Sequence, residues 1–241
     1  MLNLSKKVLC VISARGGSTG IKNKNIINFC GKPLIAWSIL QAKKSKYIDE
    51  VYVSTDSLKI AEISKSYGAK VPFLRSKKFS TRDASKFLVW KDTLKKLESF
   101  NKKKYNFYLD IDCTSPLREI KDIDKILLMQ KSKKKFDAII TVSRSRKNPY
   151  FNMLEKDKKK YLVLSKKIKK WPTSRQKSPL VFDQIASMYL VKTNFLKKSM
   201  QLYNGKILGY ELNENQGFDI DNLTDYEIIS HLFKKNYKDK I

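Results

Sequence analysis

The chain of 241 residues has little histidine and cysteine, and each shortage excludes a class of protein. One histidine, His231, and three widely spaced cysteines provide no ligand set for a zinc site. The odd number of cysteines indicates a reducing compartment. No apolar run of about 18 residues is present, and the apolar N-terminal segment is too short for a signal peptide. We therefore expect a cytoplasmic protein that neither crosses nor binds a membrane.

Acidic residues are also scarce, since 23 of them face 51 lysine and arginine residues and the formal net charge is +28. A basic surface is the usual sign of nucleic-acid binding. However, only seven of the 51 cations are arginine, the side chain that reads bases with a planar guanidinium group. The lysines occur in short clusters along the whole chain, as on a solvated surface. We expect no nucleic-acid partner, and a basic nucleic-acid-binding protein remains the non-enzymatic alternative.

Short apolar runs alternate with segments of helical periodicity through most of the chain. Strands are predicted at residues 8–13, 51–54, 71–74, 105–111, 138–142, 185–191 and 206–212. Helices are predicted at residues 34–44, 58–67, 84–100, 123–131 and 225–234. This alternation predicts one α/β domain over residues 1–241, with a mostly parallel twisted sheet and helices on both faces. Charged, proline-containing segments interrupt the pattern at residues 143–182, which predicts an inserted antiparallel arm or lid.

The first predicted strand leads into a glycine-rich loop at residues 14–25, with the sequence ARGGSTGIKNKN. Its three glycines allow the backbone to bend around an anion, with exposed N–H groups binding phosphate oxygens. Arg15 and Lys24 add positive charge. The loop has neither the ending of a Walker A motif nor the glycine spacing of the dinucleotide fingerprint. The residues alone leave two interpretations, a phosphate-binding loop at the carboxyl edge of the sheet and a mobile turn.

Two aspartates, Asp219 and Asp221, are two residues apart in the sequence GFDID. In an extended backbone they project from one face, where both carboxylates can reach a hard cation such as Mg²⁺. The alternative is that either aspartate caps the helix that follows. Asp110 and Asp112 also share a strand face, which fits a further metal contact or a solvated strand end.

Several motifs that follow the loop resemble, in the same order, those of the acylneuraminate cytidylyltransferases, the CMP-sialic acid synthetase-like family. The matching segments are GKPLIAWSI at 31–39, VSTD at 53–56, LRS at 74–76, DAS at 83–85, TSPLR at 114–118, RQ at 175–176 and FDID at 218–221. Together with the loop they span nearly the whole chain. The resemblance implies a Rossmann-like nucleotidyltransferase fold. It also implies transfer of CMP from CTP to the anomeric hydroxyl of an acidic, sialic-acid-like 2-keto-3-deoxy sugar, with release of pyrophosphate.

The same resemblance implies the residues that form the site. Arg15, Lys24 and Asp221 would be catalytic, and Asp219 with Asp221 would bind Mg²⁺. The residues expected to bind CTP and the sugar are Ala14, Gly16, Gly17, Asn25, Arg75, Ser85, Asp112, Arg175 and Gln184. Among these, the guanidinium group of Arg175 would hold the sugar carboxylate in bidentate fashion.

The segment around Trp171 and Pro172 resembles the dimerisation region of the family, which implies a homodimer. The chain departs from the family pattern at two other positions. Asp112 stands where many relatives have a glutamine that helps to read cytosine, and a carboxylate can accept a hydrogen bond from the cytosine N4 amine. Asp183 stands where relatives often have a cationic residue near the sugar site. This replacement suggests a different acceptor sugar, one with an amino group that could pair with the carboxylate. A Kdo-type or amino-sugar acceptor, another nucleoside triphosphate, and a relative that only binds nucleotide therefore remain alternatives.

Overall fold

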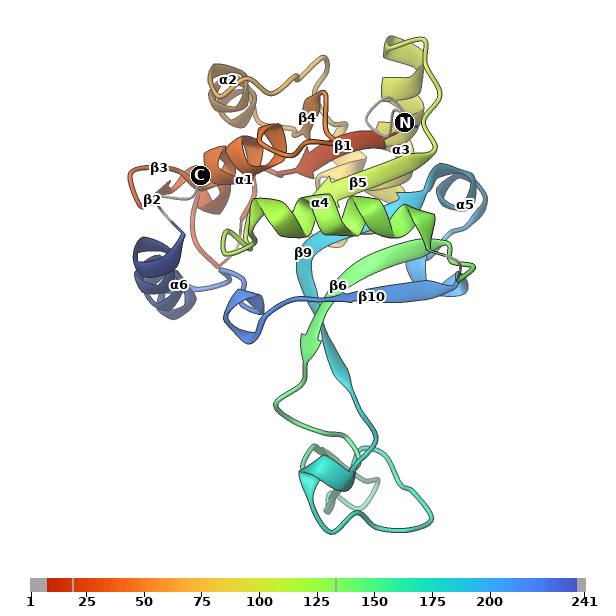
Figure 1. Ribbon diagram of the computed structural model, residues 1–241. Helices are drawn as coiled ribbons and strands as arrows, with labels where there is room; N and C mark the ends of the chain where they lie inside the picture. The colour runs from red at the N-terminus through yellow and green to blue at the C-terminus, as the bar shows by residue number, and fades with distance from the viewer. Residues whose placement is uncertain (1–7, 19, 133, 238–241) are drawn as a thin grey trace.

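A six-stranded sheet forms the centre of the molecule, in a computed structural model that describes residues 8–18, 20–132 and 134–237 (Figure 1). The strand order is β10-β6-β9-β5-β1-β4. These strands are β1 (Val8–Ser13), β4 (Val51–Ser54), β5 (Phe107–Ile111), β6 (Ala138–Arg144), β9 (Phe182–Lys192) and β10 (Ile207–Glu211). β9 runs antiparallel to β5 and β6, and the other neighbouring pairs are parallel. The predicted mostly parallel sheet is confirmed.

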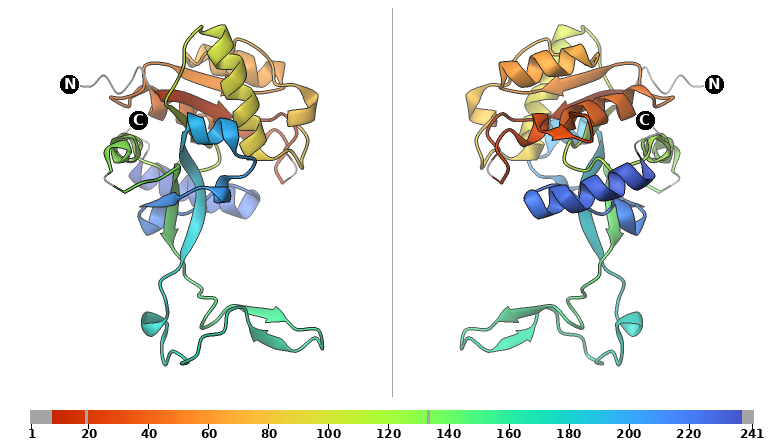
Figure 2. Two further views of the ribbon diagram at one scale, coloured as in Figure 1. Left: turned by 90° about the vertical axis from the view of Figure 1, so that its right-hand side faces the viewer. Right: turned by 90° about the vertical axis from the view of Figure 1, so that its left-hand side faces the viewer.

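Helices cover both faces of this sheet (Figures 1 and 2). They are α1 (Leu34–Lys43), α2 (Leu58–Ser66), α3 (Lys86–Phe100), α4 (Ile120–Leu128), α5 (Thr193–Lys198) and α6 (Leu223–Asn236). One core contains apolar side chains of α1, α2 and α4, and a second core contains those of α3 and α5. α6 packs against α1 in a third core, where the Trp37 and Phe233 rings are 4.7 Å apart. No helix in the described residues is long and apolar enough to cross a membrane.

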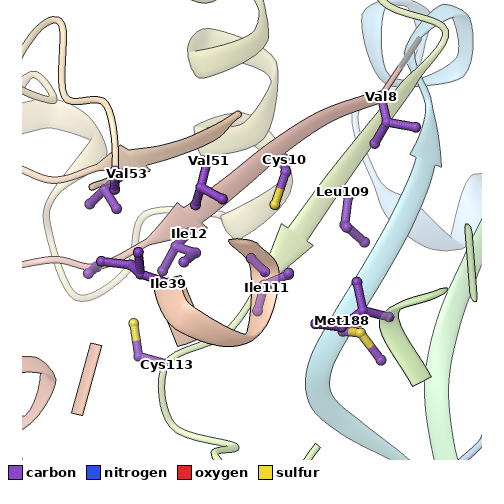
Figure 3. Packing of buried hydrophobic residues seen from close by; sticks show 14 of the residues in the cluster. Val8, Cys10, Ile12, Ile39, Val51, Val53, Leu109, Ile111, Cys113 and Met188 are labelled. Atoms are coloured by element: carbon purple, nitrogen blue, oxygen red, sulfur yellow. The ribbon is translucent and has the colours of Figure 1, made fainter. Parts of the chain in front are cut away.

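β1 shows why the strands in the middle of the sheet are continuously apolar. Cys10 and Ile12 point into the first core, and Leu9 and Val11 point into the second. Figure 3 shows Cys10 and Ile12 packed among side chains of the neighbouring strands. Because both faces of β1 are buried, each residue of Val8–Ile12 is at most 8% exposed. Only the carboxyl end of β1, at the edge of the sheet, is therefore accessible. The loop at residues 14–25 begins there.

The prediction of a strand at residues 71–74 is wrong. The chain makes a single bridge between Lys70 and Tyr52 of β4 and then leaves the sheet. Pro72 has no N–H group to continue the ladder. The short helix α5 is an element that the sequence analysis did not predict. Six residues are too few to display a helical period, although Leu196 of this helix is fully buried.

An arm at residues 145–181 connects β6 to β9 and projects away from the sheet (Figures 1 and 2). It contains an antiparallel hairpin of β7 (Leu154–Lys156) and β8 (Leu162–Leu164), so the predicted inserted arm is present. Its apolar side chains are largely exposed, including Trp171 at 60% and Tyr161 at 69%. The arm therefore adds little to the core of the molecule that carries it.

Glu98 connects the C-terminal end of α3 to α5. Its Oε1 atom accepts a hydrogen bond of 2.8 Å from Lys197 Nζ, and its Oε2 atom accepts one of 3.4 Å from Lys104 Nζ. Burial opposes the charged form, but these lysines and the backbone N–H of Tyr105 outweigh it and lower the pKa of Glu98 below its usual 4.5. We expect Glu98→Gln to reduce the free energy of unfolding at pH 7 by about 1–2 kcal/mol.

Because the folded-state pKa of Glu98 is lowered, its contribution is complete above the unfolded-state pKa and disappears as the pH falls through the folded-state value. Urea denaturation of wild type and Glu98→Gln at pH 7 and at progressively lower pH should show a difference that shrinks below pH 4.5. The exposed Glu62→Gln on α2 is the matched control. A difference that is absent at pH 7, or independent of pH, would show that this ion pair does not stabilise the fold.

Candidate active site

A cavity of about 450 Å³ lies at the carboxyl edge of the sheet and combines segments that are far apart in the sequence. It is bordered by Ser13 at the end of β1, by Thr114 after β5 and by the N-terminal part of α3. The predicted site residues that line it are Arg15, Lys24, Asn25, Arg75, Asp112 and Asp221. Among the described residues, Ala14, Gly16, Gly17, Ser85, Arg175, Gln184 and Asp219 were predicted for the site but do not line this cavity.

Lys24 joins the loop to the C-terminal aspartate segment. Its Nζ atom is 2.9 Å from Oδ1 of Asp221 and donates a second hydrogen bond of 2.7 Å to the carbonyl oxygen of Ile220. Gly20 also approaches this segment closely, because a Cβ atom there would lie 2.1 Å from the backbone oxygen of Asp221. The loop and the aspartate segment thus meet directly, although 197 positions separate Lys24 and Asp221.

Hydrogen bonds within the loop and to Ser54 and Asp56 hold the described part of the loop in place. The Asn25 side chain donates to the carbonyl oxygen of Arg15 at 3.0 Å, and the backbone N–H of Ala14 donates to Ser54 of β4 at 3.0 Å. The backbone N–H of Gly16 donates to Asp56 at 2.9 Å. These contacts favour an ordered loop over a mobile turn. They also engage the Gly16 N–H, which we had expected to face a phosphate.

Arg75 is buried below the cavity and holds the neighbouring loop. Its Nε atom donates to Ser54 Oγ at 3.2 Å, and its guanidinium group also donates to the carbonyl oxygens of Ser54 and Phe79. Burial lowers the pKa of Arg75, against the opposing effect of nearby anionic groups such as Asp56. Its bonds to backbone oxygens fix the shape of this side of the cavity.

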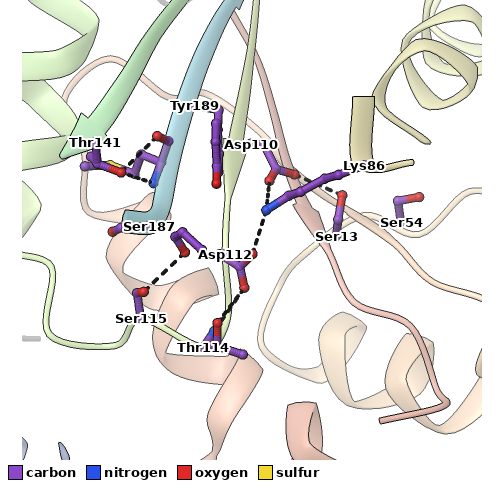
Figure 4. Close-up of polar contacts among 12 residues, drawn as sticks. Ser13, Ser54, Lys86, Asp110, Asp112, Thr114, Ser115, Thr141, Ser187 and Tyr189 are labelled. Atoms are coloured by element: carbon purple, nitrogen blue, oxygen red, sulfur yellow. Dashed lines mark hydrogen bonds and ion pairs between the residues drawn. The ribbon is translucent and has the colours of Figure 1, made fainter. Parts of the chain in front are cut away.

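A lysine between two aspartates forms part of the cavity wall (Figure 4). Lys86 Nζ is 2.6 Å from Oδ2 of Asp112 and 3.0 Å from Oδ2 of Asp110. Oδ1 of Asp110 accepts a hydrogen bond of 2.9 Å from Ser13, and Oδ1 of Asp112 accepts bonds from the N–H and hydroxyl groups of Thr114 at 3.2 and 3.0 Å. The sequence analysis did not identify Lys86, because nothing in its local sequence shows that it points toward β5.

Charge and burial shape the titration of this cluster. Burial opposes ionisation of Asp112, but Lys86 and Thr114 outweigh it and lower its pKa. For Asp110, burial and the nearby charge of Asp112 raise the pKa despite Lys86. The two aspartates considered for an additional metal contact both pair with the ammonium group of Lys86.

Asp219 and Asp221 are the carboxylates whose chemistry fits Mg²⁺. Burial, followed by the negative charges of Asp221 and Asp112, raises the pKa of Asp219. A divalent cation would neutralise the negative charge of these neighbouring carboxylates. In the described residues no group of three or more His, Cys, Asp or Glu side chains could hold a metal. Two carboxylates nevertheless suit Mg²⁺, which takes its remaining ligands from phosphate oxygens and water.

The helix that follows these aspartates has another N-cap. The side chain of Asn222 caps α6 by accepting a 3.0 Å hydrogen bond from the N–H of Asp225. The Asp221 side chain is 72% exposed and faces the cavity. The alternative in which Asp219 or Asp221 caps the helix is therefore wrong.

A family model described as cytidylyltransferase matches residues 9–239. The chain belongs to the cytidylyltransferase family. It is 37% identical over 230 residues to post-translational flagellin modification protein B of Campylobacter coli, covering 95% of this chain and 96% of the relative. It is 36% identical over 236 residues to CMP-N,N'-diacetyllegionaminic acid synthase of Campylobacter jejuni, covering 97% and 98% of the two chains. The predicted relationship to the CMP-sialic acid synthetase-like enzymes is confirmed, and the protein is a nucleotidyltransferase.

Solved structures support the fold of this cytidylyltransferase. The structure of CMP:2-keto-3-deoxy-manno-octonic acid synthetase complexed with CTP superposes with a TM-score of 0.69 at 17% sequence identity. The match covers 95% of this chain and 99% of that chain. The predicted nucleotidyltransferase fold is therefore confirmed.

Arg118, the last residue of the TSPLR segment of this cytidylyltransferase, supports the cavity from the protein interior. The guanidinium group is fully buried and donates to Gln41 Oε1 at 3.0 Å, to Ser38 Oγ at 2.7 Å and to the carbonyl oxygen of Ser187 at 2.9 Å. It also donates to the carbonyl oxygen of Asp112. Burial lowers the pKa of Arg118 to about 10. Arg118 therefore fixes the end of β5, from which Asp112 and Thr114 enter the cavity.

Two residues predicted for the sugar lie outside the cavity of the cytidylyltransferase. Arg175 belongs to the arm, where its Nη1 atom donates to the carbonyl oxygen of Arg146 at 3.0 Å. Gln184 on β9 donates to the hydroxyl of Tyr189 at 2.9 Å and accepts a hydrogen bond from Tyr203. The cavity thus contains most of the residues expected to contact the nucleotide phosphates but neither of these two residues expected near the sugar.

Proposed function

We propose that this cytidylyltransferase transfers CMP from CTP to the anomeric hydroxyl of a nonulosonic acid that carries N-acyl groups, and releases pyrophosphate. The observation that carries the proposal is the shared cavity, in which Arg15 and Lys24 of the loop meet Asp221. Cations and a carboxylate at the carboxyl edge of an α/β sheet suit a nucleoside triphosphate with its divalent cation. We expect the nucleotide to bind there with its phosphates along the loop.

The proposed reaction is an in-line attack by the anomeric oxygen on the α-phosphate, and the protein contributes mainly position and charge. Arg15 and Lys24 stabilise the negative charge that develops on the phosphate oxygens and on the departing pyrophosphate. Asp219 and Asp221 would hold Mg²⁺, which screens phosphate charge when bound. Asp221 holds Lys24 by the 2.9 Å ion pair. This ion pair orients the ammonium group of Lys24, which lines the cavity.

The choice of acceptor rests on two observations. The name of the Campylobacter jejuni relative specifies a sugar acid with two N-acetyl groups. In this chain Asp183 is exposed and pairs with Ser143, where β6 and β9 leave the sheet for the arm. An acidic side chain at this place favours an acceptor that offers N–H donors over one that offers only hydroxyl and carboxylate groups.

Purified protein should be assayed with each of the four nucleoside triphosphates and with N,N'-diacetyllegionaminic acid, N-acetylneuraminic acid and Kdo. We expect pyrophosphate release and a CMP-linked product, detected by mass spectrometry, with CTP and the diacetylated acceptor turned over most efficiently. Equal turnover of the three acceptors would contradict the preference for N-acyl groups. Absence of any CMP-linked product would contradict the proposed reaction.

We also propose a cytoplasmic homodimer in which each single-domain chain contributes its arm to the contact. The exposed Trp171 and Leu162 of the arm supply apolar surface for such an interface. Trp171→Asp should raise the dissociation constant of the dimer at least about 30-fold in sedimentation experiments, as expected for a buried tryptophan anchor. Leu58→Asp on α2 is the control, since Leu58 is 67% exposed on the body. A monomeric wild type, or equal dissociation of both variants, would contradict the proposal.

A further inference from the structure

The cavity wall formed by α3 and the end of β5 presents a hydrogen-bond donor and an acceptor side by side. The donor is Lys86 Nζ and the acceptor is Oδ2 of Asp112, and these two atoms are 2.6 Å apart. Both residues line the cavity, and their side chains are 35% and 19% exposed. Ala84 and Val89 provide apolar surface beside them. Apolar surface and a polar pair in the same cavity are suited to a nucleobase.

Both atoms retain hydrogen-bonding capacity. An ammonium group has three N–H bonds, and within the described part of the chain Lys86 Nζ has two carboxylate partners, Asp110 and Asp112. The Tyr189 ring lies on another side, with its centroid 4.5 Å from Nζ. The two bonds from Thr114 go to Oδ1 of Asp112, whereas Lys86 is the hydrogen-bond partner recorded for Oδ2 among the described residues. A carboxylate oxygen accepts two bonds, so Oδ2 can take another.

The pair is also rigid. Asp110 is fully buried, accepts a hydrogen bond from Ser13 and holds the Lys86 ammonium group in place on the side away from Asp112 (Figure 4). Thr114 fixes the orientation of the Asp112 carboxylate through two hydrogen bonds. Preorganised groups of this kind discriminate between ligands strongly, because a mismatched ligand leaves them desolvated without a partner.

We propose that Lys86 and Asp112 together read the Watson–Crick edge of cytosine, and that Lys86 is a specificity-determining residue of the nucleotide site. Oδ2 of Asp112 accepts a hydrogen bond from the N4 amine of cytosine, and Lys86 donates one to N3. Uracil presents the reverse order, with an acceptor at O4 and a donor at N3, so both contacts become repulsive. The inference rests on the proposed use of CTP and deepens it by assigning the base contact.

The test is equilibrium binding of CTP and UTP to the full chain without an acceptor sugar, measured by calorimetry. UTP is the informative competitor because it differs from CTP only at this edge and has the same ring size. Lys86→Met keeps the length of the side chain and removes its N–H donors. We expect this variant to lose at least about tenfold of the CTP-over-UTP preference, mainly through weaker CTP binding. Lys95→Met, at an exposed position of the same helix, should retain the wild-type preference.

Asp112→Asn provides a second variant, because its amide can donate to uracil O4 and should narrow the same preference at least about tenfold. If Lys86→Met does not fold, Asp112→Asn alone tests the assignment of the base contact. An unchanged CTP-over-UTP ratio in the folded variants would overturn the assignment of the base contact. Wild-type protein that prefers CTP but turns over none of the tested sugars would leave this inference standing and contradict only the proposed transfer of CMP to a sugar acid. Wild-type protein that does not prefer CTP to UTP would overturn both.

Discussion

Replacement of Asp221 by asparagine is expected to lower kcat/KM for CMP-sugar formation at least about 1,000-fold and to leave the fold intact. The side chain is 72% exposed in the cavity, so its charge contributes little to the core. In the site it performs two functions, because it holds Lys24 at 2.9 Å and is one of the two carboxylates proposed to bind Mg²⁺. Loss of the charge removes one metal ligand and frees the catalytic lysine.

The rate of pyrophosphate release over a range of CTP concentrations, at saturating acceptor, gives kcat/KM and measures this effect, and thermal denaturation checks the fold. The exposed Asp49→Asn removes the same charge outside the cavity and serves as the control. Activity of Asp221→Asn within a few-fold of the control would rule out the role assigned to this carboxylate. A large fall in melting temperature would instead assign it to stability.

Replacement of Gly20 by alanine is expected to lower kcat/KM at least about 100-fold. A Cβ atom at Gly20 would lie 2.1 Å from the backbone oxygen of Asp221, and backbone cannot move aside as a flexible side chain can. The loop would have to retreat from the aspartate segment, which separates Lys24 from Asp221. The loss of activity would therefore come from the changed positions of Lys24 and Asp221, because the substitution removes no charged group.

Gly17→Ala is the matched comparison for Gly20→Ala. No atom lies within 4 Å of a Cβ atom built at Gly17, and the substitution keeps the backbone N–H. We expect its loss of kcat/KM to be at least about tenfold smaller than that of Gly20→Ala. Equal losses in the two variants would show that the loop responds to any added side chain, and that the approach of Gly20 to Asp221 is unimportant.

The elements of the fold that could be predicted are those in which the pattern of apolar residues along the sequence matches the side chains that the structure buries. The apolar run of β1 is buried on both faces, so its sequence marks both the strand and the point at which the loop starts. The strand predicted at residues 71–74 failed because a short apolar run does not reveal whether a neighbouring strand is available. Similarly, α5 owes its position to the burial of Leu196 and not to a visible helical period.

The candidate site divides in the same way. Arg15, Lys24 and Asp221 could be selected because glycine-rich loops and closely spaced carboxylates have a recognisable chemistry. Lys86 could not, because one more lysine among many carries no local signal. Arg118 lies in the TSPLR segment, but its role comes from contacts made across the sheet, such as its bond to Ser187, 69 positions away. Such partners are fixed by tertiary packing alone.

The most direct test of the account is a crystal structure of the protein with CTP and Mn²⁺ in place of Mg²⁺, in which anomalous scattering locates the cation. We predict a manganese peak between the carboxylates of Asp219 and Asp221 and the phosphates of CTP, with Arg15 and Lys24 also contacting those phosphates. CTP bound in the cavity with the manganese peak elsewhere, or CTP bound away from the loop at residues 14–25, would contradict the account.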